Sequence, residues 1–391
     1  MASWRRWVAA AIFVATAAEP AAAQDTVKIG LVLPMTGAFT STGRQIAAGA
    51  RLYVQENGTA VAGKAIELIL RDDAGIADNT RRIAQELLVN DKIQILAGFG
   101  LTPLALAAAP LATQTKVPMV VMGAATSFVT ERSPYIVRTS FAQAQPVVII
   151  ADWVARNGVK RAATMVSDFA PGYDSETYFK ERFTKAGGEI AESIRVPLQN
   201  PDYAPFLQRV RDIAPDGLFA FVPAGQTGGF FRQFIERGLD KSGVRLFGAG
   251  DLTDDEFLNQ MGDPVLGIVT AYFYSAAHPS PKNKAYVEAF KKANRGLRPN
   301  FFSVGGYDGM QLIYAALRKT NGAVDADAML DAMKGAAWES PRGPIAIDAE
   351  TRDIIQDIYI RKVERRDGEL YNIELETFPA VKDPVKAAKK N

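Results

Sequence analysis

Short apolar runs alternate along this chain with longer segments whose apolar residues recur at helical spacing. Apolar runs at 27–37, 64–73, 93–100 and 117–126 are separated by helical patterns at 42–58, 79–91 and 103–116. Short β-rich runs between helices indicate parallel βαβ units. We therefore predict an α/β lobe that ends near residue 140, with Asn79 as the N-cap of its second helix.

The same alternation starts again beyond this point. Helical patterns at 145–157, 175–189, 205–215 and 228–240 alternate with apolar runs at 161–168, 189–198, 217–223 and 244–251. Farther along, we predict helices at 283–295, 305–320 and 325–336, a strand at 343–348 and a β-hairpin that turns at Asp367-Gly368. Two lobes with one plan suggest a structural duplication, although no sequence repeat links them.

The first 24 residues follow a different pattern. Two arginines precede an apolar run that ends at Ala18, and three alanines stand just before Gln24. A short basic start, an apolar segment too short for a bilayer and a small-residue cleavage site are typical of a secretory signal peptide. We therefore expect residues 1–23 to be removed and the mature protein to work in the periplasm. No other stretch approaches the roughly 18 apolar residues of a membrane span.

The composition of the chain excludes several kinds of functional site. The chain has no cysteine, which excludes disulfides, thiol catalysis, thiolate metal sites and a lipid anchor on an N-terminal cysteine. Its one histidine, His278, cannot build a histidine-rich metal site. A net charge of +2 without a basic cluster does not predict nucleic-acid binding, and hydrolase, metalloprotease and phosphate-loop motifs are missing. We therefore predict neither an enzyme nor a metal or other cofactor.

Candidate binding segments stand where predicted strands give way to helices. In an open α/β sheet a ligand lies at the carboxyl ends of the strands, beside the helix N-termini. The junctions read PMTGAFTSTG, GFGLTP and GAATSF in the first lobe, and SDFAPGYDS, VPAGQTGG and GAGDL in the second. We predict that these six segments form the walls of a ligand cleft.

In order and spacing, the junctions resemble those of the periplasmic branched-chain amino acid binding family of ABC transporters. The parallels include IGLVLPMTGAFTSTGRQIAAGARL, VSDFAPGYDSETYFKERFTKAGGEI and FSVGGYDGMQLIYAAL. The resemblance implies two Rossmann-like α/β lobes, the type I periplasmic binding protein clamshell, with three hinge crossings near 138–142, 272–276 and 348–353. Lobe one would be 24–140 plus 275–349, and lobe two 141–274 plus 350–391. The lobes would close over a ligand, and an inner-membrane ABC permease would recognise the closed form.

The first lobe offers a carboxylate site in GFGLTP. Gly100 lets the backbone approach a ligand, and the start of a helix suits a carboxylate. The resemblance places Thr102 where the family has a serine hydroxyl on the ligand carboxylate. Thr102 would also suit an N-cap, and the two roles are compatible.

The next junction of this lobe extends the same site. The resemblance matches Ala124, Ala125 and Thr126 to the family's second carboxylate-binding segment, whereas Ser127 would serve as a plain helix cap. Thr42 stands where the branched-chain amino acid binders carry a bulky aromatic residue. That departure suggests a wider pocket on this side.

The second lobe contributes Phe169, Tyr173, Ala224, Gly225 and Asp251. The resemblance places Asp251 near the acidic partner of an amino acid's ammonium group, which a buried ammonium requires. A plain N-cap of a helix over 254–261 is the competing interpretation of Asp251.

Aromatic residues favour one class of ligand. Phe39, Phe99, Phe169 and Tyr307 stand at or near the predicted cleft, and such rings suit a planar aromatic acid. Ordinary core packing would also place some rings there. We favour a small aromatic carboxylate, such as a benzoate or cinnamate derivative, bound by a monomer. A branched-chain or other aliphatic amino acid, an amide or urea, and a ligand-sensing role for a receptor remain as alternatives.

Overall fold

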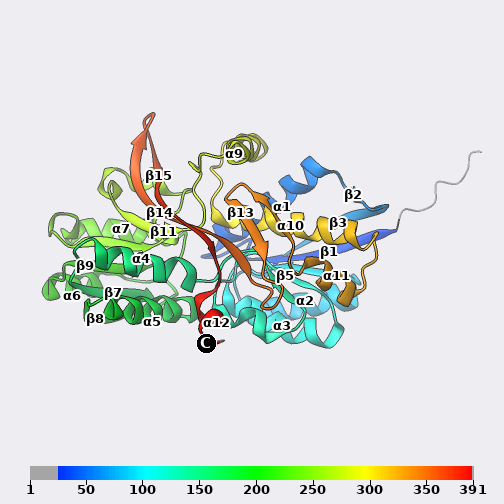
Figure 1. Ribbon diagram of the computed structural model, residues 1–391, viewed down its shortest axis with the longest axis horizontal. Coiled ribbons are helices and arrows are strands. Elements are labelled where there is room, and N and C mark those ends of the chain that lie inside the picture. The colour runs from blue at the N-terminus through cyan, green and yellow to red at the C-terminus, as the bar shows by residue number, and fades with distance from the viewer. Residues whose placement is uncertain (1–24, 390–391) are drawn as a thin grey trace, which may run out of the picture.

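The computed structural model describes residues 25–389, so the signal peptide predicted for residues 1–23 lies outside the described part of the chain. Helices and strands alternate there around two separate sheets. Figure 1 shows the two sheets side by side along the long axis, each flanked by its own helices. The predicted α/β class with two lobes is confirmed.

The first sheet has six strands and forms the core of lobe one. They are β1 (Thr26–Leu33), β2 (Ala60–Val61), β3 (Lys64–Asp72), β4 (Ile95–Gly98), β5 (Met119–Val121) and β6 (Ile136–Arg138). Their order is β2-β3-β1-β4-β5-β6, and only β2 runs antiparallel to its neighbour. β4 and β5 are buried along their whole length, which explains their continuous apolar runs.

Six helices accompany this sheet, and a 3-10 helix follows β5. They are α1 (Thr40–Asn57), α2 (Ala77–Val89), α3 (Thr102–Thr115), η1 (Ser127–Arg132), α9 (Pro281–Ala293), α10 (Phe301–Lys319) and α11 (Ala326–Met333). Four of the helices pack on its strands, whereas α9 and α11 pack mainly on other helices. The predicted N-cap Asn79 is wrong, because Ile76 holds that position and Asn79 lies inside α2. Asp73 organises the turn before the helix instead, since its carboxylate accepts from the Gly75 N–H and the Thr80 hydroxyl.

The second sheet has nine strands and forms the core of lobe two. They are β7 (Arg161–Ser167), β8 (Glu189–Val196), β9 (Gly217–Phe221), β10 (Arg245–Ala249), β11 (Val269–Tyr272), β12 (Ala337–Ser340), β13 (Gly343–Ile347), β14 (Ile354–Arg366) and β15 (Glu369–Val381). The order is β12-β13-β14-β11-β10-β9-β7-β8, with β15 on β14. Asp367 and Gly368 both have positive φ in the β14–β15 turn, which confirms the predicted hairpin.

The helices of lobe two differ from the prediction at residues 254–261 and at residues 384–388, where no helix was predicted. They are α4 (Ala144–Arg156), α5 (Ala170–Lys185), α6 (Ala204–Ile213), α7 (Thr227–Glu236), η2 (Leu239–Lys241), η3 (Gly250–Thr253), α8 (Leu258–Met261), η4 (Asp263–Val265) and α12 (Pro384–Ala388). The helix expected over 254–261 is only the four-residue α8. The reason is local, because the Asp254 carboxylate accepts from the Glu256 N–H and holds residues 254–257 in a turn.

The chain passes from the first sheet to the second after β6, returns to α9, α10 and α11 after β11, and rejoins the second sheet at β12. The first two passages lie near the crossings expected at 138–142 and 272–276, whereas residues 348–353 join β13 to β14 within one sheet. β12 and β13 pair within the second sheet, although they belong to the range expected for lobe one. The exact lobe boundaries therefore stay a prediction.

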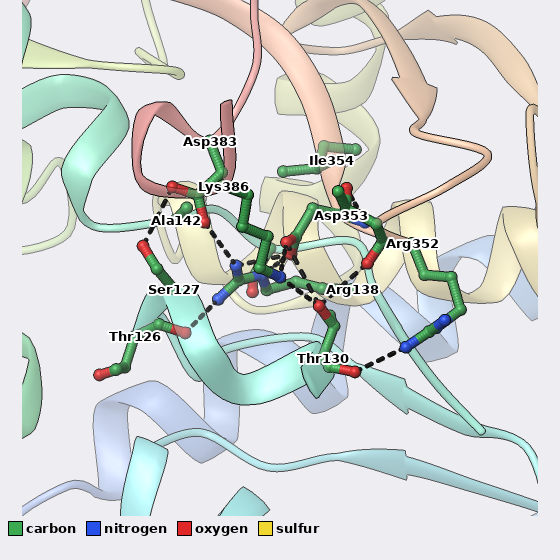
Figure 2. A network of polar contacts seen from close by, with 12 residues as sticks. Thr126, Ser127, Thr130, Arg138, Ala142, Arg352, Asp353, Ile354, Asp383 and Lys386 are labelled. Atoms are coloured by element: carbon green, nitrogen blue, oxygen red, sulfur yellow. Dashed lines mark hydrogen bonds and ion pairs between the residues drawn. The ribbon is translucent and has the colours of Figure 1, made fainter. Parts of the chain in front are cut away.

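A buried group of charges holds this boundary together (Figure 2). Arg138, at the end of β6, donates through Nε to Asp353 Oδ1 at 2.7 Å. Lys386 of α12 also binds Asp353. Asp383, the N-cap of α12, accepts from the Ser127 hydroxyl at 3.1 Å. The C-terminal helix is thereby tied to lobe one, so it acts as a strap across the hinge.

Candidate functional site

One cavity lies between the two lobes, at the carboxyl ends of their strands. The space in it that is open to a water-sized molecule is about 30 Å³, so the walls lie close together. Its walls come from lobe one, lobe two and the first crossing. The lining residues are Phe39, Thr42, Gly100, Leu101, Thr102, Gly123, Ala124, Ala125, Phe141, Gln143, Phe169, Pro171, Phe221, Pro223, Ala224, Asp251 and Phe302.

The wall in lobe one depends on two closely packed backbone segments. A Cβ atom at Gly123 would lie only 2.7 Å from the Cα of Gly100. The Ala124 N–H donates to the Phe99 carbonyl at 2.9 Å and binds the two segments together. Both glycines are therefore required by close approach, and the start of α3 is left facing the cavity.

Thr102 is the first residue of α3 and is not its N-cap, a position that Leu101 holds. Its hydroxyl donates to Thr126 Oγ1 at 3.1 Å and accepts from the Thr126 N–H at 3.3 Å. The backbone N–H groups of a first helical turn have no intrahelical acceptor and carry partial positive charge. At Thr102 a hydroxyl group therefore lies next to a helix N-terminus, and a helix N-terminus suits an anion.

Five phenylalanine rings surround the rest of the cavity. Phe39 and Phe302 come from lobe one, Phe141 from the first crossing, and Phe169 and Phe221 from lobe two. Phe169 and Phe221 stack with centroids 6.0 Å apart and an angle of 24° between their planes. No arginine or lysine joins the lining within residues 25–389, so aromatic and aliphatic faces dominate the site.

Gln143 lines the cavity just before α4. Its Nε2 donates to the Ser175 hydroxyl at 2.9 Å, and that hydroxyl donates to the Pro171 carbonyl at 2.8 Å. Its Oε1 is buried and has no hydrogen-bond partner in the described part of the chain. The site therefore contains an acceptor that the protein itself does not satisfy.

Asp251 lies on the opposite side, in η3. Its Oδ2 accepts from the Tyr272 hydroxyl at 2.9 Å. Burial raises the pKa of Asp251 to about 7, although the Tyr272 hydrogen bond and the nearby Arg361 charge lower it in part. Asp251 is not the cap of a following helix, because α8 begins seven residues later. At neutral pH the carboxyl group is therefore close to half ionised.

Nine of the predicted binding residues line the cavity. They are Phe39, Thr42, Gly100, Thr102, Ala124, Ala125, Phe169, Ala224 and Asp251. Thr126 lies directly behind the lining and acts through Thr102. Gly225 approaches the Ala38 carbonyl of lobe one but does not line the cavity.

Three other predicted residues lie away from the lining. Phe99 packs in the core of lobe one. Tyr173 is 40% exposed, and its hydroxyl donates to Asp168 at 2.9 Å. Tyr307 packs edge-on against Tyr53, with its hydroxyl on Glu56. For all three, helix or turn geometry directs the ring away from the cleft.

Sequence reasoning missed eight lining residues. They are Leu101, Gly123, Phe141, Gln143, Pro171, Phe221, Pro223 and Phe302. Four of them, Leu101, Gly123, Pro171 and Pro223, stand inside the six junctions near a predicted residue, while Phe221 ends β9 and Phe302 lies in the first turn of α10. Phe141 and Gln143 are different, because they lie in the first crossing, where no strand-to-helix junction marks them. Their place in or beside the crossing expected near 138–142 is the sequence feature that could have identified these two residues.

The two lobes also contact each other at the rim of the cavity. Glu256 of lobe two accepts from the Ser41 hydroxyl and from Gln45 Nε2, both at 2.7 Å, and pairs with Arg44. All three partners lie on α1 of lobe one. On the side toward the hinge, the Ser127 N–H donates to Asp174 Oδ2 at 3.3 Å. The lobes are therefore closed over the cavity.

Other kinds of site are not found within residues 25–389. No group of three or more histidine, aspartate or glutamate side chains there could hold a metal ion. His278 packs against Tyr359, with Nδ1 2.9 Å from Glu374 Oε2. None of the helices in the described range combines the length and the apolar character that crossing a membrane would take.

Known proteins share both the sequence and this architecture. Residues 26–369 match the family model described as periplasmic binding protein. The chain is 43% identical to the Leu/Ile/Val-binding protein homolog 6 of Brucella abortus (strain 2308), over 96% of this chain and 97% of that protein.

Two solved structures are similar as well. One is a solute binding protein of an ABC transporter from Rhodopseudomonas palustris BisB5 in complex with 3,4-dihydroxybenzoic acid, at 63% identity and a TM-score of 0.91, covering 93% of this chain and 99% of that one. The other, from Rhodopseudomonas palustris HaA2 in complex with p-hydroxybenzoic acid, is 42% identical with a TM-score of 0.90, covering 93% and 100%. With a family match over most of its length, two closed α/β lobes and a cavity between them, this chain belongs to the periplasmic binding protein family.

Proposed function

We propose that this protein is the solute-binding component of an ABC importer and captures an aromatic carboxylate between its lobes. The strongest support for this ligand class is that five phenylalanine rings enclose the cavity. Among the described residues, no arginine or lysine lines it. Phenylalanine faces accept a planar ring through offset or edge contacts. The two solved relatives at 63% and 42% identity hold hydroxylated benzoic acids, which supports the same class.

The ligand carboxylate is assigned to lobe one. The Leu101 and Thr102 N–H groups precede the first hydrogen bonds of α3 and offer donors on one side of the cavity, while the Thr102 hydroxyl, through its bonds to Thr126, positions this wall. Ala124 and Ala125 line the adjacent wall with small side chains, and the Ala124 N–H is already bonded to the Phe99 carbonyl. A carboxylate in this corner leaves the ring to extend toward Phe169 and Phe221 of lobe two.

Asp251 favours a second candidate, an aliphatic amino acid. A buried carboxylate at the cavity is what an α-ammonium group needs, and the Brucella relative is named for leucine, isoleucine and valine. In the aromatic-acid proposal Asp251 instead stays largely protonated next to Tyr272 when the ligand is bound. The two candidates therefore differ in how they use this one side chain.

A thermal-shift screen separates the two candidates. A ligand at 100 times its dissociation constant adds about 2.7 kcal/mol to the free energy of unfolding, enough to raise the melting temperature visibly. We expect a shift with benzoate-type acids and none with leucine or valine. Asp251→Asn should retain aromatic-acid binding, whereas an amino-acid binder would lose its ligand. A shift with leucine alone would overturn the aromatic-acid proposal.

The cellular role rests on the family. We propose that the mature protein is a periplasmic monomer that makes and breaks no bond and delivers its ligand to an inner-membrane permease. The rim contacts between Glu256 and α1 support a closed form with a defined surface. Fractionation of cells into periplasm and cytoplasm, followed by light scattering of the purified protein, tests location and oligomeric state.

A further inference from the structure

Gln143 lines the ligand cavity and carries an unsatisfied acceptor. Oε1 of its amide is buried and has no hydrogen-bond partner within residues 25–389, and the residue lines the cavity wall. A buried carbonyl oxygen without a donor is costly, so native structures contain few of them. A partner brought in by the ligand would remove this cost.

The amide orientation follows from the hydrogen bonds behind it. The Ser175 hydroxyl has one hydrogen, and it donates that hydrogen to the Pro171 carbonyl at 2.8 Å. Ser175 can therefore only accept from Gln143, and only the NH2 end of the amide can donate. The contact of 2.9 Å between Nε2 and Ser175 Oγ thus leaves Oε1 as the free end.

A free carbonyl oxygen selects for a donor on the ligand. A plain benzoate has none on its ring, whereas a ring hydroxyl has one. Gln143 belongs to the first crossing, and Phe141, two residues before it, contributes one of the five rings. A ligand ring that packs against these phenylalanines would therefore have its substituents near the Gln143 amide.

We propose that Gln143 recognises a ring hydroxyl, so that the ligand of this protein is a hydroxylated aromatic acid. This inference rests on the proposed function, because it needs an aromatic acid in the cavity. Gln143 acts here as a specificity residue. A ligand without the hydroxyl leaves Oε1 buried and unpaired, and a site built to bind a hydroxyl rejects such an analogue strongly.

The first test uses the unmodified protein and a series of ring substituents. Calorimetry compares benzoate with its 3- and 4-hydroxy, amino and fluoro derivatives. Hydroxy and amino groups donate, whereas fluorine has a similar size and cannot. We expect at least one hydroxybenzoate to bind about ten- to a hundredfold more tightly than benzoate and its fluoro analogue. Equal affinities for donors and non-donors would overturn the inference.

The second test changes the residue. Gln143→Met keeps the length of the side chain and removes the acceptor, so the ratio of hydroxybenzoate affinity to benzoate affinity should fall to near unity. Gln233→Met is the matched control, because Gln233 of α7 also has a buried, unpartnered Oε1 but does not line the cavity. It should retain the full preference. A hydroxyl preference that survives in Gln143→Met would contradict our assignment.

The outcomes distinguish this inference from the proposed function. If no aromatic acid binds while leucine does, both proposals fail together. If aromatic acids bind without regard to the hydroxyl, the proposed function stands and only the role of Gln143 is lost. Should Gln143→Met not fold, the substituent series on the unmodified protein still decides the question.

Discussion

Three polar side chains of the cavity are held in place by partners that lie behind them. The pairs are Thr102 with Thr126, Gln143 with Ser175 and Asp251 with Tyr272. Each pair fixes the position of one polar group before a ligand arrives. Binding then costs less conformational freedom, which is the physical basis of preorganisation.

The Thr102 hydroxyl gives the first prediction at this scale. Thr102→Val should weaken aromatic-carboxylate binding by about 1–3 kcal/mol, because the bonds that position Thr126 in this wall are lost and the buried Thr126 N–H is left without an acceptor, while the side-chain volume is kept. Thr113→Val on the same helix is the control, since Thr113 bonds Ser133 outside the cavity lining. Calorimetry measures both, and an unchanged affinity for Thr102→Val would remove Thr102 from the site.

Asp251 gives a pH-dependent prediction. Its pKa of about 7 in the folded protein lies above its ordinary value of 3.8, so the folded state retains a proton that the unfolded state has released. The contribution of Asp251 to stability is therefore lost as pH rises from about 4 to about 7, and it changes little above that.

The measurement is a difference between two proteins. Asp251→Asn cannot ionise, so its free energy of unfolding relative to the unmodified protein should increase between pH 5 and pH 7 and level off near pH 8. Urea titrations without ligand at each pH give both values. A difference that is independent of pH would show that burial does not raise this pKa.

Among the elements, the short helix α12 makes several buried polar contacts despite its small size. It spans only Pro384–Ala388, yet it brings Lys386 into the buried network of Figure 2. Its N-cap Asp383 reaches the Ser127 hydroxyl of lobe one. The element therefore connects the end of the chain to the hinge, which its weak helical propensity alone would not achieve.

Removing the buried charge of α12 should lower the free energy of unfolding. Lys386→Met should lower the free energy of unfolding by about 1–3 kcal/mol, because Asp353 keeps its pair with Arg138 but loses the buried charged donor on its second oxygen. Lys389→Met on the neighbouring surface pair with Glu131 should cost less than about 1 kcal/mol. Urea denaturation compares the two variants, and equal losses would argue against a strap function.

For the whole molecule, the arrangement of the lobes decides whether a cavity exists. Its walls come from both sheets and from the crossing between them. Contacts at the rim, through Glu256, hold the lobes together independently of any ligand. The free energy of ligand binding is therefore coupled to closure.

Loosening the rim should weaken binding without touching the cavity. Glu256→Ala removes the contacts to Ser41, Arg44 and Gln45, so a smaller fraction of molecules is closed and the dissociation constant should rise about tenfold. Glu236→Ala, on an exposed part of α7, is the control. Calorimetry gives the affinity, and X-ray scattering with and without ligand gives the degree of closure. Unchanged affinity and scattering would show that the rim does not contribute.

Sequence patterns predicted most of the elements, because helical and strand periodicities survive in a chain with two open sheets. The exceptions have local causes. At Asn79 and at residues 254–261, aspartate side chains form turns that displaced the expected helix start or shortened the helix. The candidate site was predicted in part, since the junctions mark the carboxyl ends of strands. The rotation of the helix that follows a junction decides which residue of the junction faces the cavity. In the first junction of lobe two, for example, Pro171 lines the cavity and Tyr173 does not.

By itself, the sequence determined the α/β class, the two-lobe plan, the strand-to-helix junctions and the absence of cysteine chemistry. These features follow from local periodicity and from which residue types are present. Only the tertiary structure decided that Phe141 and Gln143 of the crossing join the cavity, that Tyr307 does not, and that Asp251 is buried beside Tyr272. The physical reason is that these properties arise between segments more than twenty residues apart, when the lobes close and remove water from the groups between them.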